Sequence, residues 1–220
     1  MRAWLALPLT LVASTACNER ETRVVHYGNG QTWSEIHLED GTPVGTWRTW
    51  YESGQPKSEG SYRSGQRDGL WTTWWENGGE QSKGSFTHGR QEGPWSYWFE
   101  SGQVASQGRF ENGIREGEWI DWYGSGTRRA QVTFHHGEQD QVVRTFYANG
   151  RLEHEWTYDK GVLHGPYRDF REDGTERVMG EYSGGKKVGL WLAFRPDGSV
   201  NEVLSGYFED NEKKRPYEQE

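Results

Sequence analysis

The chain has 220 residues and a formal net charge of -8, with 25 Lys and Arg residues against 33 Asp and Glu residues. This acidic balance, without a long basic run, argues against a nucleic-acid backbone or an anionic membrane surface as the partner. Leu, Ile, Val and Phe together account for only 35 residues, a share typical of disordered chains, but 13 Trp and 11 Tyr supply large apolar surfaces that a fold can bury.

Residues 1–16 have the pattern of a secretory signal peptide. One positive charge, Arg2, precedes an apolar stretch at 3–12 that is too short to span a membrane. Cys17, the only cysteine, follows Ser14-Thr15-Ala16, which resembles a bacterial lipobox although Ser14 stands where leucine is usual. The same residues also suit the ordinary signal peptidase, so two processing routes stay open.

Both routes predict export from the cytoplasm. If Cys17 is lipidated, it anchors the chain in the lipid bilayer of the bacterial cell membrane or outer membrane, with residues 17–22 as a lipidated N-terminus and linker. If it is not, the mature chain is periplasmic or extracellular. A single cysteine allows no intramolecular disulfide.

Residues 23–210 form a repeat array with a period of 24 residues. A first aromatic column contains Trp47, Trp71, Trp95, Trp119, Val143, Tyr167 and Trp191. A second aromatic column, three residues further on, contains Trp50, Trp74, Trp98, Trp122, Phe146, Phe170 and Phe194. Glycine columns keep the same period, and Gln141 takes one glycine position.

Each repeat carries a hairpin signal, such as Asn77-Gly78, that is typical of a two-residue type I′ turn. A two-residue turn at Asn77-Gly78 would pair residues whose numbers sum to 155, so Trp74 would face Gln81. We expect each aromatic ring of the first column to cover its cross-strand glycine partner within the hairpin. The predicted pairs are Trp47 with Gly60, Trp71 with Gly84, Trp95 with Gly108, and Val143 with Trp156.

The frequent glycines and the absence of a 3.6-residue apolar period argue against helices. We therefore predict an all-β fold: an elongated, single, twisted antiparallel meander of about eight 24-residue β-hairpin repeats, with sixteen strands. The charged residues 211–220 are expected to form a frayed tail.

The unit of spaced Gly, Trp, Asn-Gly and aromatic residues resembles the MORN repeat, in its bacterial variant. The resemblance covers essentially the whole mature chain and implies rows of β-hairpins. Bacterial multi-repeat members are often labelled antitoxin components of toxin–antitoxin systems, and eukaryotic members act as interaction scaffolds linked to membrane lipids. The motif residues are structural, so the resemblance implies little about activity.

Both aromatic columns are candidate binding surfaces as well as candidate core. The first column is expected to be core. Trp71 and Trp74 differ in strand parity, so they should lie on opposite faces, and one row would be partly exposed. The candidate binding residues are therefore those of the second column, Trp50, Trp74, Trp98, Trp122, Phe146 and Phe170.

No catalytic, metal or cofactor site is predicted. His135-His136 is the one adjacent histidine pair, and strand alternation would send the two rings to opposite faces. Carboxylates such as Glu76, Glu116 and Asp121 fit solvated turns and strand surfaces better than a catalytic pair. We expect a non-catalytic scaffold that binds an unidentified protein partner through an extended face. The alternatives are an antitoxin or immunity module that neutralises a toxin, and a cell-wall glycan binder or hydrolase.

Overall fold

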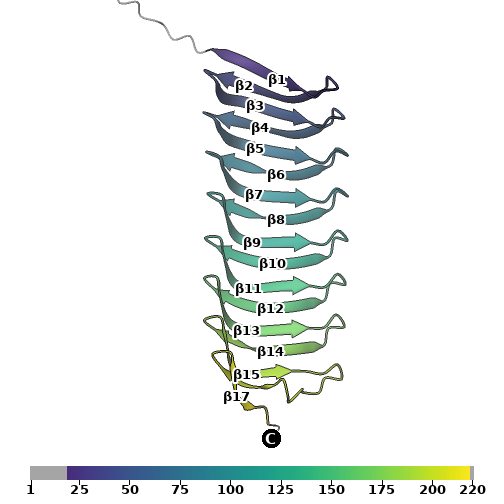
Figure 1. The fold of residues 1–220 in the computed structure, drawn as a ribbon, viewed down its shortest axis with the longest axis vertical. Helices are drawn as coiled ribbons and strands as arrows, with labels where there is room; N and C mark the ends of the chain where they lie inside the picture. The colour runs from purple at the N-terminus through teal and green to yellow at the C-terminus, as the bar shows by residue number, and fades with distance from the viewer. Residues whose placement is uncertain (1–18, 219–220) are drawn as a thin grey trace, which may run out of the picture.

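The computed structural model describes residues 19–218, and the predicted signal peptide and Cys17 lie outside this range. The described residues form 17 strands and no helix, and each strand pairs antiparallel with the next along the chain (Figure 1). The strands are β1 Arg20–His26, β2 Thr32–Glu39, β3 Thr42–Trp50, β4 Pro56–Arg63, β5 Gln66–Trp74, β6 Glu80–Thr87, β7 Arg90–Trp98, β8 Val104–Glu111, β9 Ile114–Trp122, β10 Arg128–His135, β11 Glu138–Phe146, β12 Leu152–Asp159, β13 Val162–Phe170, β14 Glu176–Ser183, β15 Lys186–Ala193, β16 Gly206–Glu209 and β17 Glu212–Pro216.

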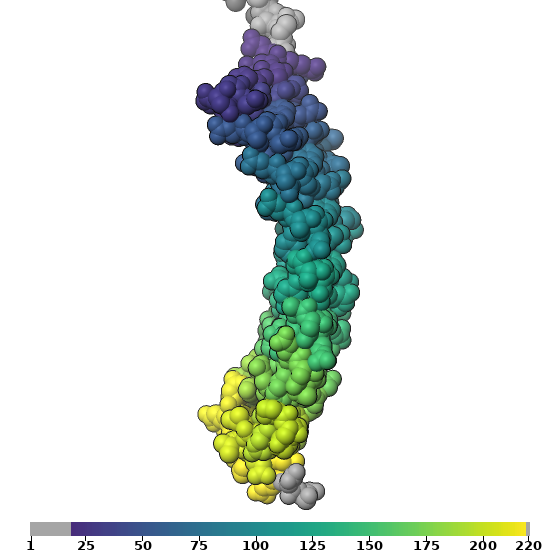
Figure 2. Space-filling model, turned by 90° about the vertical axis from the view of Figure 1, so that its right-hand side faces the viewer, coloured from purple at the N-terminus to yellow at the C-terminus, as the bar shows by residue number. Residues whose placement is uncertain are grey.

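The molecule is a long open sheet whose two ends are far apart. Figure 1 shows the strands stacked like rungs, and Figure 2 shows that the sheet seen from its edge forms a bowed column. This confirms the expected elongated meander of hairpin repeats. A long sheet bends in this way because each strand carries its own twist.

The two ends of the array differ from the sequence-based expectation. Strand β1 already begins at Arg20, inside the expected linker, and β17 lies inside the expected frayed tail. The chain reverses at Asp210-Asn211, where both residues have positive φ, and the Lys187 amide donates to Asn211 Oδ1 at 2.7 Å. This turn ties residues 212–216 to the sheet, so the prediction of a frayed tail was wrong for them.

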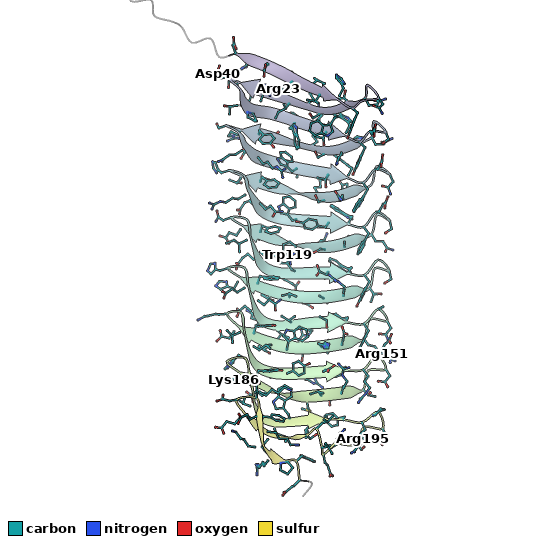
Figure 3. The ribbon with its side chains drawn as sticks, in the orientation of Figure 1. Arg23, Asp40, Trp119, Arg151, Lys186 and Arg195 are labelled. Atoms are coloured by element: carbon teal, nitrogen blue, oxygen red, sulfur yellow. The ribbon has the colours of Figure 1, made fainter. Side chains whose placement is uncertain are left out.

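The type I′ turns lie at the edge of the sheet opposite to the predicted one. Both central residues have positive φ at Ser64-Gly65 and at His88-Gly89, and the same holds at five equivalent turns. Asn77, in contrast, has no positive φ. Figure 3 shows the two edges, with Asp40 and Lys186 beside the type I′ turns and Arg151 and Arg195 near the other loops.

The Asn-Gly loops have three residues instead of two. Gly78 N donates to Trp75 O at 2.9 Å, and Trp75 N donates to Gly79 O at 2.8 Å, which is a hairpin loop with a glycine bulge. Asn77 is used here for its side chain, since its Oδ1 accepts from Gly79 N and its Nδ2 donates to Glu100 O in the next repeat. Asn-Gly therefore fits both loop types, and the prediction of a type I′ turn was wrong.

The predicted strand register is confirmed at all the pairs of the first column. Trp47 faces Gly60, Trp71 faces Gly84, Trp95 faces Gly108, and Val143 faces Trp156. Next to the loop the register shifts, and Trp74 faces Glu80 instead of Gln81. The register shift next to the loop compensates for the third loop residue. From Thr73, which faces Ser82, the strands therefore pair as they would around a two-residue turn.

The tryptophan rings cover a different glycine from the one expected. A Cβ on Gly60 would collide with the ring of Trp71, and one on Gly84 would collide with the ring of Trp95. Each ring therefore lies over the glycine of the preceding strand and not over its partner within the hairpin. The same side chain anchors itself there, because Trp71 Nε1 donates to Ser61 O at 3.2 Å.

This contact recurs along the sheet and forms the core. Trp71, Trp95, Trp119 and Trp191 are all buried. Phenylalanine and tyrosine rings between them complete a row of edge-to-face contacts, with the Phe110 and Trp119 centroids 4.9 Å apart. Val143 is buried as well, whereas Trp47 and Tyr167 are half-buried, so most of the first column is core.

One repeat replaces both the tryptophan and the glycine of this contact. Val143 takes the tryptophan position, and Val132 takes the position of the glycine that such a ring would cover. Val143 is 2% exposed, so the smaller pair still fills the site. Gln141, at the adjacent bulge, adopts φ 61° where the other repeats have glycine.

The paired replacement suggests a double-mutant test in a regular repeat. Gly84→Val places a branched side chain where the Trp95 ring lies, and we expect a loss of about 3 kcal/mol or more in the free energy of unfolding. Trp95→Val alone should cost about 3–5 kcal/mol because it leaves a cavity. The double variant should be more stable than the sum of the two losses implies, as measured by urea denaturation. Strict additivity would contradict the assigned ring contact.

Candidate functional site

The two aromatic columns line separate hollows. Trp71 lines one together with Thr73 and Trp95, whereas Trp74 lines another together with Leu70 and Thr72. The lining of these two hollows agrees with alternation at Trp71 and Trp74, which places them on different faces. Trp122, next to a register shift, instead lines one hollow together with Asp121. In a single-layer sheet both faces then carry aromatic rings.

The second column is only half covered by its neighbours. Its members Trp50, Trp74, Trp98, Trp122 and Phe146 are half-buried, and Phe170 is buried at 8% exposure. Trp50 and Trp74 line one further hollow together. The predicted binding residues therefore form a row along the array, one per repeat, instead of a single enclosed site.

A hydrogen-bond ladder connects this row from one repeat to the next. The residue just before each three-residue loop donates to the backbone carbonyl of the second-column aromatic one repeat later. Tyr51 Oη donates to Trp74 O at 2.7 Å, and Trp75 Nε1 donates to Trp98 O at 3.1 Å. The other donors of the ladder are Tyr27, Tyr123, Tyr147 and Arg171.

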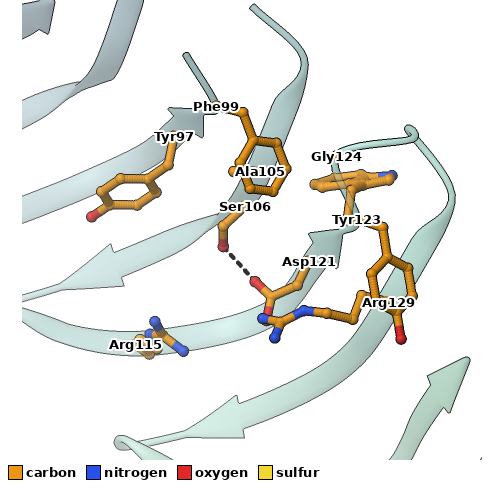
Figure 4. Close-up of a pocket in the computed structure, with 10 residues that line it drawn as sticks. Tyr97, Phe99, Ala105, Ser106, Arg115, Asp121, Tyr123, Gly124 and Arg129 are labelled. Atoms are coloured by element: carbon orange, nitrogen blue, oxygen red, sulfur yellow. Dashed lines mark hydrogen bonds and ion pairs between the residues drawn. The ribbon is translucent and has the colours of Figure 1, made fainter. Parts of the chain in front are cut away.

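Phe99 interrupts the ladder because its ring has no polar atom to donate to Trp122 O. A hollow of about 650 Å³ lies at this point, between β7 and β10 (Figure 4). Four aromatic side chains contribute to its walls, namely Tyr97, Phe99, Trp122 and Tyr123. Of these, only Trp122 belongs to the predicted binding set.

Charged groups lie beside the aromatic walls. Asp121 accepts a hydrogen bond from Ser106 Oγ at 2.6 Å and pairs with Arg129 at 3.0 Å. Arg115 also lines the hollow, and its guanidinium lies 4.3 Å from the ring centre of Trp119. Tyr97 accepts a hydrogen bond from Gln91, and burial raises the pKa of its phenol. The hollow thus combines aromatic faces with one carboxylate and two guanidinium groups.

Tyr97, Asp121 and Gly124 differ from the residues that hold the same positions in the earlier repeats. The positions of Tyr97 and Asp121 correspond to Thr73, whose hydroxyl shares a 2.7 Å hydrogen bond with Ser82. Gly124 stands where three earlier repeats have glutamate. A comparison of the repeat columns would have shown these departures, but attention to the tryptophans alone missed them.

The histidine pair does not behave as strand alternation suggests. His136 lies in a type I′ turn, and the rings of His135 and His136 are 4.2 Å apart. The His136 amide and the His135 ring both hydrogen-bond Glu116, and these bonds lower the pKa of that carboxyl. The prediction of opposite faces was wrong, because positive φ at position 136 breaks the alternation. Within residues 19–218 no group of three His, Cys, Asp or Glu side chains is placed to hold a metal ion.

Comparison with known families supports the repeat assignment. Residues 43–64 and 91–112 match the MORN repeat variant. These two MORN-variant stretches correspond to β3–β4 and β7–β8, one hairpin each, so the chain carries a repeat-based architecture of the kind that serves as a binding scaffold. No curated protein matches the chain. Among the described residues, no helix has the length and apolar character needed to cross a membrane.

The interrupted ladder can be tested with two opposite substitutions. Phe99→Tyr adds a hydroxyl that can donate to Trp122 O, and we expect it to raise the free energy of unfolding by about 0.5–1.5 kcal/mol. Tyr51→Phe removes the bond to Trp74 O in an uninterrupted repeat and should lower it by a similar amount. Urea denaturation of both variants measures the two shifts. Shifts of the same sign would contradict the ladder.

Proposed function

We propose that this chain is an exported, non-catalytic scaffold that binds a protein partner along the second aromatic column. The observation that carries the proposal is the row of half-buried tryptophans at Trp50, Trp74, Trp98 and Trp122 on a single-layer sheet. Two strand spacings separate neighbouring rings, so the four span about 29 Å. A row of that length matches a protein interface of ordinary size, and tryptophan is enriched among the residues that dominate binding energy.

The environment of the carboxylates supports binding over catalysis. Asp121 is engaged by Ser106 and Arg129, and Glu116 is engaged by His135 and His136. Both carboxylates connect neighbouring strands or turns. A general acid would need a raised pKa, whereas the pKa of Glu116 is lowered by its hydrogen bonds.

We further propose that Cys17 is lipidated and holds the array at a membrane. The sequence pattern around Cys17 supports this, and β1 begins only three residues later, at Arg20. A lipid at that position would fix the N-terminal end of the sheet close to the bilayer, with the rest of the column extending away from it. A single acyl chain holds only weakly, so stable anchoring would need the multiple chains that a lipoprotein carries.

The protein-binding role is tested by affinity capture. The mature chain is used as bait in an envelope extract, and captured proteins are identified by mass spectrometry. We expect a partner that the wild type retains and that a Trp50→Leu/Trp74→Leu variant loses. Ile114→Ser is the control, because it removes an exposed apolar side chain at the turn edge of the sheet. A partner retained equally by all three chains would contradict docking on the row, and a captured toxin would assign the antitoxin role.

The anchor is tested by fractionation. The full chain should partition with membranes, and Cys17→Ala should release it into the soluble fraction or leave it unprocessed. A Ser14→Leu variant, which restores the usual lipobox residue, should remain with the membranes. Membrane association that is unchanged in a processed Cys17→Ala chain would contradict the lipid anchor.

A further inference from the structure

We propose that the hollow between β7 and β10 is a binding site for an uncharged saccharide. This site goes beyond the protein-binding role proposed above, because it lies in one interrupted repeat and not along the whole row. Its volume of about 650 Å³ lies within the range of small-ligand sites. Aromatic and charged side chains meet there in a combination that the neighbouring repeats lack.

The aromatic walls supply a surface for the apolar face of a sugar ring. Phe99, Trp122 and Tyr123 line the hollow from neighbouring repeats, and Figure 4 shows Phe99 above Asp121 and Tyr123 to its right. The face of an aromatic ring carries negative charge density, so it attracts the polarised C–H groups of a sugar. In a regular repeat, the donor at the position of Phe99 would be engaged with the carbonyl of Trp122.

The polar groups offer a donor and an acceptor side by side. Arg129 Nη2 donates to Asp121 Oδ2, and Asp121 Oδ1 accepts from Ser106. A carboxylate has about four lone-pair sites and a guanidinium has five N–H donors, so both groups retain unused capacity. Two adjacent sugar hydroxyls can use this pair, one donating to the carboxylate and the other accepting from the guanidinium.

The hollow carries two guanidinium groups and one carboxylate, and the carboxylate opposes an anion locally. The Asp121 carboxylate faces any ligand held by Arg129, which disfavours a free carboxylate such as the end of a peptide. Arg115 and Arg129 together disfavour a cation. An uncharged polyhydroxy ligand meets neither penalty and uses both kinds of hydrogen-bonding group.

The charged pair alone does not distinguish the hollow, because Arg177 and Asp169 form the same pair two repeats later. In the earlier repeats, Thr49 with Ser58 and Thr73 with Ser82 connect the same strand positions through one neutral hydrogen bond. Asp121 lies opposite Ala130, which holds the position of Ser82. Asp121 pairs instead with Arg129 on a partly exposed surface, where an ion pair contributes little stability. The hollow differs from the repeat that contains Asp169 in its aromatic walls and in Phe99, because Tyr147 at the position of Phe99 keeps its bond to Phe170 O.

The test is a titration of the mature chain, followed by tryptophan fluorescence and isothermal calorimetry. The probes are the disaccharides maltose, cellobiose, lactose and N,N′-diacetylchitobiose, with N-acetyl-tryptophan as a carboxylate probe. We expect saturable millimolar binding of at least one disaccharide and none of the carboxylate. Trp122→Leu and Asp121→Asn should each weaken binding roughly tenfold or more.

Matched controls separate the site from the rest of the array. Trp33→Leu removes an exposed tryptophan on β2, and Asp169→Asn alters the column of Asp121 two repeats later. Both lie away from the hollow and should leave the affinity unchanged. Arg129→Gln keeps the bond between Ser106 and Asp121, so it replaces Asp121→Asn if that variant unfolds. The proposal is overturned if no disaccharide binds, if the carboxylate probe binds in its place, or if Trp33→Leu weakens binding as much as Trp122→Leu. Capture of a protein partner does not depend on any of these results.

Discussion

The contact on which this fold depends is a tryptophan ring lying over the glycine of the preceding strand. A single sheet has no second layer to cover its side chains, so burial must come from neighbours on the same face. Glycine at positions such as Gly84 leaves room for the ring of Trp95, and the ring takes up the space that an ordinary side chain would fill. Trp95 Nε1 donates to Ser85 O, so each contact also satisfies a backbone carbonyl. An array poor in aliphatic residues thereby acquires two aromatic rows, with buried Val143 between them.

Links between successive repeats make the array cooperative while keeping each interaction local. At one edge, Gly89 N donates to Arg67 O in the previous repeat, and equivalent bonds stack the type I′ turns. At the other edge, the ladder of Tyr51 and its equivalents joins the three-residue loops. Stability in such an array is close to a sum over repeats and their nearest neighbours. One missing link, as at Phe99, therefore weakens a single junction without unfolding the rest, and this gives one repeat freedom to change for function.

The strand register could be predicted from the sequence because the 24-residue period and the glycine columns allow only one alignment of large residues against small ones. The pairing of Val143 with Trp156 followed from that alignment and is confirmed. The turn types could not be predicted, because Asn77-Gly78 suits both a type I′ turn and a three-residue loop in which the asparagine side chain bonds to the backbone. The direction of the rings could not be predicted either. Trp71 has a glycine on each side, Gly60 and Gly84, and only three-dimensional geometry decides which one it covers.

The candidate site was only partly accessible from sequence for a related reason. The period draws attention to what is constant, whereas a ligand site in a repeat protein arises where the period is broken. Phe99, Asp121 and Gly124 each look unremarkable in their own strand, and only their departure from the repeat columns and their shared hollow connect them. A change that gives up a hydrogen bond between repeats lowers stability by about 0.5–1.5 kcal/mol. At Phe99 the lost bond coincides with an aromatic hollow and a charged pair, and this coincidence distinguishes the site from ordinary drift among repeats.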